Sequence, residues 1–251
     1  MYEDDELTVL DLEAELADPL DQIEVVEEAT EVVTYDPEEM LPLLTAPEAQ
    51  QRMLAARAFC EIEDARAIPQ LIQLLKDSCP LVRVSATYAL GRNMAPEAIA
   101  PLISQLKDWN GYVRKGAVWA LGNSHHPEAL PPLAHALKTD IPAVRLWAAS
   151  ALAQMATLGY KSIIMALPTL IAVMRHDDIA AVRSNSAWAL GQLCKELPSN
   201  VIYGTAIDAL IETFAEDEDL GVREDARAAI LGLGDARGLQ IIEELEQDGW
   251  F

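Results

Sequence analysis

One ten-residue phrase occurs six times along this chain, and it constrains the fold more than any other feature. In its fullest form the phrase reads Val-Arg-x-x-Ala-x-x-Ala-Leu-Gly, as at residues 82–91. Each copy, including a weaker first one, is marked by its arginine: Arg52, Arg83, Arg114, Arg145, Arg183 and Arg223. The first four arginines are 31 residues apart, and the last two follow after steps of 38 and 40. A period of this length is typical of a solenoid built from stacked repeats.

A second apolar segment follows each copy of the phrase, as at residues 71–75. Its apolar residues recur at intervals of three or four, which favours a helix over a strand. Prolines such as Pro96 suit the first turn of a helix, where the missing N–H costs nothing. The glycines that close the phrase, Gly91, Gly122 and Gly191, are expected to be left-handed C-caps. We therefore predict an all-α fold, an α-solenoid of six stacked helix pairs, each with a helix A and a helix B.

Charge divides the chain into two parts. Residues 1–47 hold 16 Asp or Glu and no Lys or Arg, whereas the remainder holds 25 acids against 18 basic residues. We expect residues 1–36 to be an acidic tail, which is either a disordered, solubilising segment or a docking segment for a basic partner. Residues 36–37 are Asp-Pro, typical of an N-cap and a first helical position. We expect residues 37–47 to hold a capping helix, and residues 48–251 to form the solenoid.

Aspartates recur six residues before the arginine that opens the next phrase. Asp77 precedes Arg83 in this way, while in the third unit Thr139 takes the position and Asp140 is shifted by one. A carboxylate at the end of a helix B can form a bidentate bond with the guanidinium. We therefore expect a structural ladder down the solenoid. Its members are Asp77, Arg83, Asp108, Arg114, Arg145, Asp177, Arg183, Asp217 and Arg223.

Aromatic residues give the best indication of a binding surface. The sixth position of the phrase holds Tyr88, Trp119 and Trp188, and at 100° per residue it points away from the inward Val, Ala and Leu positions. Large aromatic residues on a polar surface are typical interface anchors. The alternative is that they pack between adjacent A helices. The candidate protein-binding residues are Tyr88, Trp109, Tyr112, Trp119, Trp147 and Trp188.

Motifs for catalysis are missing from the sequence. It contains no Gly-rich phosphate loop, no CxxC and no HExxH, so we predict no catalytic residue and no intrinsic cofactor. Cys60 and Cys194 belong to repeats one and five, at roughly 10 Å per stacked helix pair, and cannot meet at one metal. Cys79 precedes a proline in a turn between repeats, which makes it a weak candidate for a metal ligand shared with a partner.

Composition excludes several other classes of protein. A net charge of −23 argues against nucleic acid and against anionic lipid, because both need a basic surface. No apolar run reaches the length of a membrane span, and the acidic first residues differ from a signal peptide. The few, scattered cysteines fit a reducing compartment. We therefore expect a cytoplasmic location.

The repeat phrase resembles the HEAT repeats. Residues 63–69 and 233–237 resemble the inter-helix turn of the short HEAT-like units found in phycobilisome lyases. The middle repeats are also similar to cyanobacterial HEAT-repeat proteins that partner IscA-type iron–sulfur carriers. The resemblance implies a non-catalytic scaffold or adaptor with such a carrier as partner; its alternative is a phycobiliprotein bilin lyase subunit or phycobilisome chaperone. An iron–sulfur cluster or a bilin would then be shared with the partner.

Overall fold

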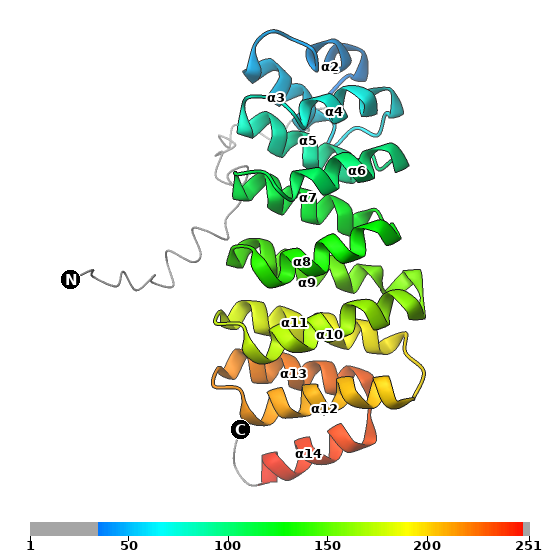
Figure 1. Cartoon of the computed structure of the whole chain (residues 1–251), viewed down its shortest axis with the longest axis vertical. Helices are drawn as coiled ribbons and strands as arrows, with labels where there is room; N and C mark the ends of the chain where they lie inside the picture. The colour runs from blue at the N-terminus through cyan, green and yellow to red at the C-terminus, as the bar shows by residue number, and fades with distance from the viewer. Residues whose placement is uncertain (1–34, 248–251) are drawn as a thin grey trace, which may run out of the picture.

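The computed structural model describes residues 35–247, and its helices stack into an elongated solenoid of two layers (Figure 1). Layer A contains α3 (Ala49–Ala58), α5 (Pro80–Arg92), α7 (Gly111–Asn123), α9 (Pro142–Gln154), α11 (Ala180–Lys195) and α13 (Leu220–Leu233). Layer B contains α4 (Ile68–Leu74), α6 (Pro96–Gln105), α8 (Leu130–Thr139), α10 (Tyr160–His176), α12 (Val201–Glu216) and α14 (Ala236–Gln247). Each A helix packs on the A helix of the next repeat and on the B helix that precedes it. The predicted all-α solenoid of six helix pairs is confirmed.

Short elements complete the stack. Three 3₁₀ turns adjoin its helices, η1 (Ala65–Ala67), η2 (Pro127–Ala129) and η3 (Met155–Leu158). Helix α2 (Pro37–Leu43) lies against α3 at the first end of the solenoid, inside the segment predicted to cap it. Its N-cap is Asp36, whose side chain accepts a hydrogen bond from the Glu38 N–H at 2.9 Å. The predicted acidic tail lies outside the described residues, apart from Tyr35 and Asp36.

The core lies between the two layers and is built from the inward positions of the phrase. Val82, Ala86 and Leu90 in α5 follow one another at intervals of four and are fully buried. Leu71 in α4 and Leu102 in α6 face them from layer B and have no exposed area. Each such Val or Leu contributes roughly 1.5–3 kcal/mol through burial, and the alanines allow the helices to approach closely.

Our prediction that the phrase glycines are left-handed C-caps is wrong. Gly91, Gly122 and Gly191 lie inside α5, α7 and α11, because each helix continues beyond the phrase. Among the described residues, the glycine that ends a helix in the left-handed conformation is Gly234, with φ of 66° after α13.

These glycines instead mark points where neighbouring A helices nearly touch. A Cβ atom on Gly91 would lie 2.2 Å from the ring of Trp119 in the next repeat. A Cβ atom on Gly122 would lie 2.9 Å from the Cβ and 3.0 Å from the Cα of Ala151. Atoms cannot approach so closely, so a larger residue would force the two helices apart.

We predict that Gly122→Ala destabilises the protein by about 1–3 kcal/mol, because the new methyl group meets the backbone of α9 and overpacks the A layer. Chemical denaturation followed by circular dichroism measures the change.

The matched control is Gly232→Ala in α13, where an added Cβ has nothing within 4 Å. This variant should be more stable than the wild type by up to about 1 kcal/mol, because alanine favours a helix. Equal effects of the two substitutions would contradict the close-approach role of Gly122.

Candidate protein-binding surface

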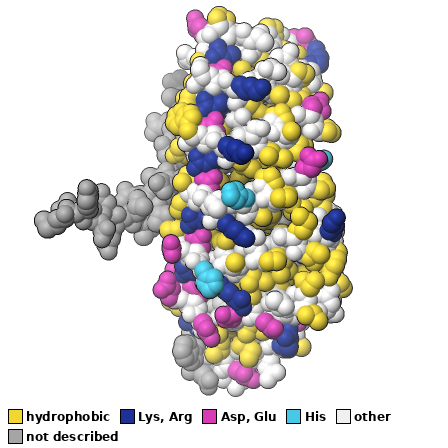
Figure 2. Space-filling view, in the orientation of Figure 1, with side chains coloured by type: hydrophobic (Ala, Val, Ile, Leu, Met, Phe, Trp, Pro, Cys, Tyr) yellow, Lys and Arg dark blue, Asp and Glu magenta, His cyan; other side chains and the backbone are white. Residues whose placement is uncertain are grey.

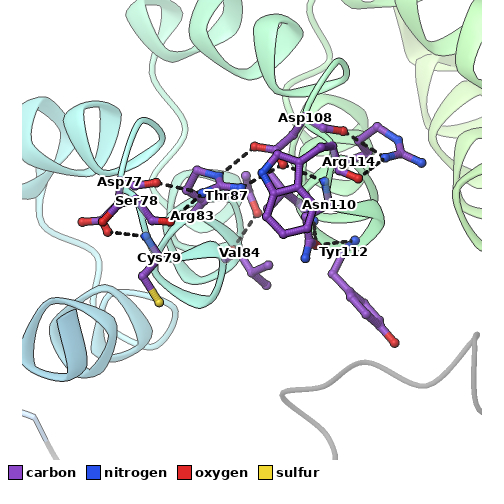
Figure 3. Close-up of polar contacts among 12 residues, drawn as sticks. Asp77, Ser78, Cys79, Arg83, Val84, Thr87, Asp108, Asn110, Tyr112 and Arg114 are labelled. Atoms are coloured by element: carbon purple, nitrogen blue, oxygen red, sulfur yellow. Dashed lines mark hydrogen bonds and ion pairs between the residues drawn. The ribbon is translucent and has the colours of Figure 1, made fainter.

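The repeat arginines lie along one edge of the solenoid, where the B helices end and the A helices begin (Figure 3). The guanidinium of Arg83 donates to both carboxylate oxygens of Asp108, from Nε at 2.7 Å and from Nη2 at 2.9 Å. Its Nη1 donates to the carbonyl oxygen of Asp77 at 2.8 Å. Arg83 therefore joins the turn before its own helix A to the turn after the following helix B.

The same connection is repeated along the solenoid. Five arginine–aspartate salt bridges have nitrogen–oxygen distances of 2.6–2.9 Å: Arg52–Asp77, Arg83–Asp108, Arg114–Asp140, Arg145–Asp177 and Arg183–Asp217. In the last repeat the Nε of Arg223 donates to the carbonyl oxygen of Phe214 at 2.9 Å. The ladder thus links consecutive turns from the first repeat to the sixth.

Our expectation about the partner of each arginine is wrong in register. Arg83 meets only the main chain of Asp77, six residues earlier, whereas the carboxylate of Asp77 pairs with Arg52. The reason is that a helix B runs back along its own helix A and brings its last residue beside the arginine 25 residues earlier. Asp140, which the sequence places out of step, takes the ladder position opposite Arg114.

Each ladder aspartate also orders the turn that contains it. The Asp77 carboxylate accepts the Cys79 N–H at 2.8 Å, and the Asp108 carboxylate accepts the Asn110 N–H at the same distance. Burial alone would raise the pKa of Asp77, but the hydrogen bonds from Arg52 and the Cys79 N–H outweigh it and lower that pKa below 3.8. The carboxylate is thereby held ionised in the folded state.

We predict that Arg83→Ala destabilises the protein by about 2–4 kcal/mol, because it leaves the Asp108 carboxylate almost buried without its cation. The side chains of this pair are only 8% and 10% exposed. Arg66→Ala is the control, since Arg66 is 56% exposed and its pairs with Asp64 and Glu38 lie on the surface. The control should lose no more than about 1 kcal/mol in urea denaturation. Similar losses of unfolding free energy in Arg83→Ala and Arg66→Ala would show that the ladder pair stabilises the protein no more than a surface ion pair does.

The lowered pKa of Asp77 predicts an acid-sensitive part of the stability. The folded state binds fewer protons than the unfolded state near the ordinary pKa of 3.8, so stability rises with pH there. This contribution is fully present above the ordinary pKa and is lost as the pH falls through the lower, folded value. The free energy of unfolding of wild type and Asp77→Asn should therefore differ at pH 6, and the difference should shrink as the pH falls below the ordinary pKa of Asp77. A difference that stays constant down to pH 2 would contradict this.

Two of the predicted aromatic anchors pack between helices. The ring centroids of Tyr88 and Trp119 are 5.3 Å apart and their planes are inclined at 44°. Trp119 in α7 lies against Gly91 in α5, and the Arg92 guanidinium is 6.0 Å from its centroid. Both aromatic side chains are only partly exposed. Their geometry is that of packing between repeats, the alternative that the sequence left open.

Two other anchors stand out on the surface, each beside a hollow. Trp188 in α11 is 44% exposed and lines a hollow of about 470 Å³ with Leu146 and Asn185. Trp109, in the turn before α7, is 76% exposed and lines a hollow of about 260 Å³ together with Tyr112. An exposed tryptophan beside a hollow is suited to binding, because the ring can contact an apolar side chain of a partner that enters the hollow.

Lys115 is a member of this surface that the sequence did not reveal. It lines the hollow beside Trp109, yet the residue is only 4% exposed, and its Nζ lies 5.4 Å from the ring centroid of Trp147. A cation over an indole face is stabilised by the ring quadrupole. No sequence motif marks this lysine, because the contact joins α7 to α9. Trp147, one of the predicted anchors, is therefore half-buried, with its ring against the Lys115 ammonium group.

The cysteines belong to different elements: Cys60 follows α3, Cys79 precedes α5 and Cys194 lies in α11. Burial raises the pKa of both Cys60 and Cys194 to about 12, which keeps these thiols protonated and poor as metal ligands. Cys79 is partly exposed at the start of α5. Between residues 35 and 247, no group of three or more His, Cys, Asp or Glu side chains is arranged to hold a metal ion.

In the same part of the chain, every helix is too short or too polar to cross a membrane.

Comparisons with known proteins agree with this architecture. A family model described as HEAT repeats matches residues 37–108, 99–163 and 155–231. A sequence comparison with curated proteins gave no match. An engineered protein from a structural genomics consortium is 27% identical, with a TM-score of 0.58, and the match covers 79% of this chain and 98% of that one.

Two further solved structures share the fold. A designed armadillo repeat protein in complex with the peptide (KR)4 is 22% identical, with a TM-score of 0.62, and the match covers 79% of this chain and all of the designed one. The complex of CpcE and CpcF of phycocyanin lyase from Nostoc sp. PCC7120 is 21% identical, with a TM-score of 0.58, over 87% of this chain and 85% of that one.

Proposed function

This chain belongs to the family of HEAT-repeat proteins, and on that premise we propose that it is a non-catalytic scaffold that holds another protein against layer A. The observation that carries the proposal is the pair of exposed tryptophans, Trp109 and Trp188, each of which lines a hollow in the solenoid surface. A tryptophan buries about 150–250 Å² when it is covered, so two of them can dominate an interface.

The ladder supports one of these anchors directly. The Arg83 guanidinium, fixed by its two bonds to Asp108, lies 5.7 Å from the ring centroid of Trp109. The cation–π contact holds an exposed ring in place before any partner arrives. A ring that is already ordered loses less side-chain entropy on binding, which favours affinity.

The partner that we propose first is an IscA-type iron–sulfur carrier, because the middle repeats resemble HEAT-repeat proteins that interact with such carriers. In this proposal the carrier supplies most ligands of any cluster. Cys79 is the thiol of this chain best suited to add one, because it is partly exposed, whereas Cys194 is buried and burial raises the pKa of Cys60 to about 12. The scaffold then positions the carrier and performs no chemistry of its own.

A second candidate is a bilin lyase subunit or a phycobiliprotein chaperone. The observation that favours it is the shared fold with the complex of CpcE and CpcF, which extends over 87% of this chain. In that case a phycobiliprotein would occupy layer A, and a bilin would be held jointly with the partner.

We predict that Trp109→Ser weakens the complex by about 2 kcal/mol or more, roughly thirtyfold in affinity, and leaves the melting temperature close to that of the wild type. The side chain is 76% exposed, so its removal opens no cavity in the free protein. Isothermal titration of the full-length chain with a purified IscA-type carrier, and separately with a phycobiliprotein, measures the affinity. Visible spectra of the purified complex distinguish an iron–sulfur cluster from a bilin.

Leu220→Ser is the matched control, because Leu220 is also an exposed apolar residue and lines neither hollow. This substitution should change the affinity less than twofold, well below the effect of a lost anchor. Unchanged affinity in both Trp109→Ser and Trp188→Ser would reject layer A as the binding surface.

A further inference from the structure

Layer B presents a second surface, a file of basic side chains that we call the lysine row. It consists of Lys76, Lys107 and Lys138, each 24 residues after the arginine of its own repeat, so the three occupy equivalent positions at the ends of α4, α6 and α8. All three are exposed. Figure 2 shows Lys and Arg side chains that follow one another down this face of the molecule. Arg175, at the end of α10, extends the row by one repeat.

The charges of the lysine row are not neutralised within residues 35–247. None of the three lysines forms an ion pair there, because the aspartates nearest in sequence, Asp77, Asp108 and Asp140, are bound by the ladder arginines. Arg175 is paired with Glu212. A regular file of uncompensated cations on a chain of net charge −23 has to be explained.

Each lysine is accompanied by an apolar neighbour one helical turn earlier. Ile72, Ile103 and Ala134 stand four residues before the three lysines and are half-buried. Residues four apart share one face of a helix, so every repeat presents the same pair of features, one cation and one apolar side chain.

The N-terminal segment has the complementary pattern. Residues 1–34 contain 13 Asp or Glu and no Lys or Arg. Within this segment an acid recurs at every third position, at Asp18, Asp21, Glu24 and Glu27. The residues directly before the last three of these acids are Leu20, Ile23 and Val26.

The spacing of this pattern matches the spacing of the repeats. In the polyproline II conformation a chain has three residues per turn and rises about 3.1 Å per residue, so residues three apart share one face and lie about 9 Å from each other. Stacked helices lie about 8–10 Å apart, so a segment in this conformation can place one acid on each successive repeat, with the apolar residue before it on an adjacent face. The described chain starts at Tyr35 beside α2, at the first end of the solenoid, and the eight residues back to Glu27 span up to about 26 Å.

We propose that residues 18–27 of this chain dock along layer B as an intramolecular ligand of the lysine row. The acids then meet the basic residues in reverse order, with Glu27 nearest Lys76 and Asp21 nearest Lys138, while Leu20, Ile23 and Val26 cover the apolar neighbours. A partner that uses layer B must displace this segment. The occupied surface differs from the aromatic surface of layer A.

Zero-length carbodiimide crosslinking of the full-length monomer tests the pairing, because it joins a lysine amine to a carboxylate in direct contact. Mass spectrometry should find links from Lys76, Lys107 and Lys138 to acids between residues 18 and 31, and these links should decrease in 0.5 M salt, which screens exposed charges. Lys161 and Lys195, exposed lysines outside the row, are internal controls. Equal linkage to the controls, links only between separate chains, or no links from the row would overturn the proposal.

A variant gives an independent readout. In the triple variant Lys76→Gln, Lys107→Gln, Lys138→Gln, a Glu-specific protease should cleave after Glu24 and Glu27 about tenfold faster than in the wild type, since three exposed ion pairs are lost. Lys161→Gln with Lys195→Gln should cleave at the wild-type rate. An unchanged rate in the triple variant would overturn the proposal. Neither measurement involves a partner protein, so its failure leaves the proposed scaffold function intact.

Discussion

The structure depends on one interaction, the bidentate bond between the arginine of each of the first five A helices and the aspartate at the end of its own helix B. The same guanidinium also holds the carbonyl oxygen of the turn before it, so each arginine joins two consecutive turns. The core of a solenoid runs along its whole length between the two layers, and each repeat contacts only its neighbours. A continuous chain of buried, charge-assisted bonds fixes the spacing of the turns where the helix packing alone would leave them free to vary.

A second constraint is that successive helices of layer A approach one another closely. Alanine and glycine positions let successive A helices come within van der Waals distance, and Trp119 fills the space over Gly91. The rigid layer that results holds Trp109 and Trp188 on its surface in fixed positions. Trp119 in this layer is packed against Gly91, whereas Trp109 and Trp188 are exposed beside hollows.

The two layers differ in the chemistry that they present. Layer A presents aromatic rings beside hollows, which suits a folded partner with apolar side chains. Layer B presents the lysine row, and it does so because the ladder occupies the aspartates that would otherwise neutralise it. The ladder thus has a consequence beyond stability, since it determines which charges remain on the surface.

The sequence by itself determined the repeat, its helices and the class of fold, because the period of 31 residues and the spacing of apolar residues are local properties that need no tertiary information. It also predicted the residue types of the ladder. It placed the N-cap of α2 at Asp36 correctly, since a cap depends only on neighbouring residues.

Only the tertiary structure decided which residues meet. Arg83 pairs with Asp108, 25 residues away, and not with Asp77, because the return path of helix B selects the partner. Gly91 serves the contact with the next repeat and does not end its helix. Trp119 and Trp188 occupy the same position of the phrase, yet one is packed and the other is exposed, because exposure depends on the neighbouring repeat. Contacts between repeats are non-local. Because equivalent residues recur in every repeat, a periodic sequence alone does not indicate which copy of a residue meets which.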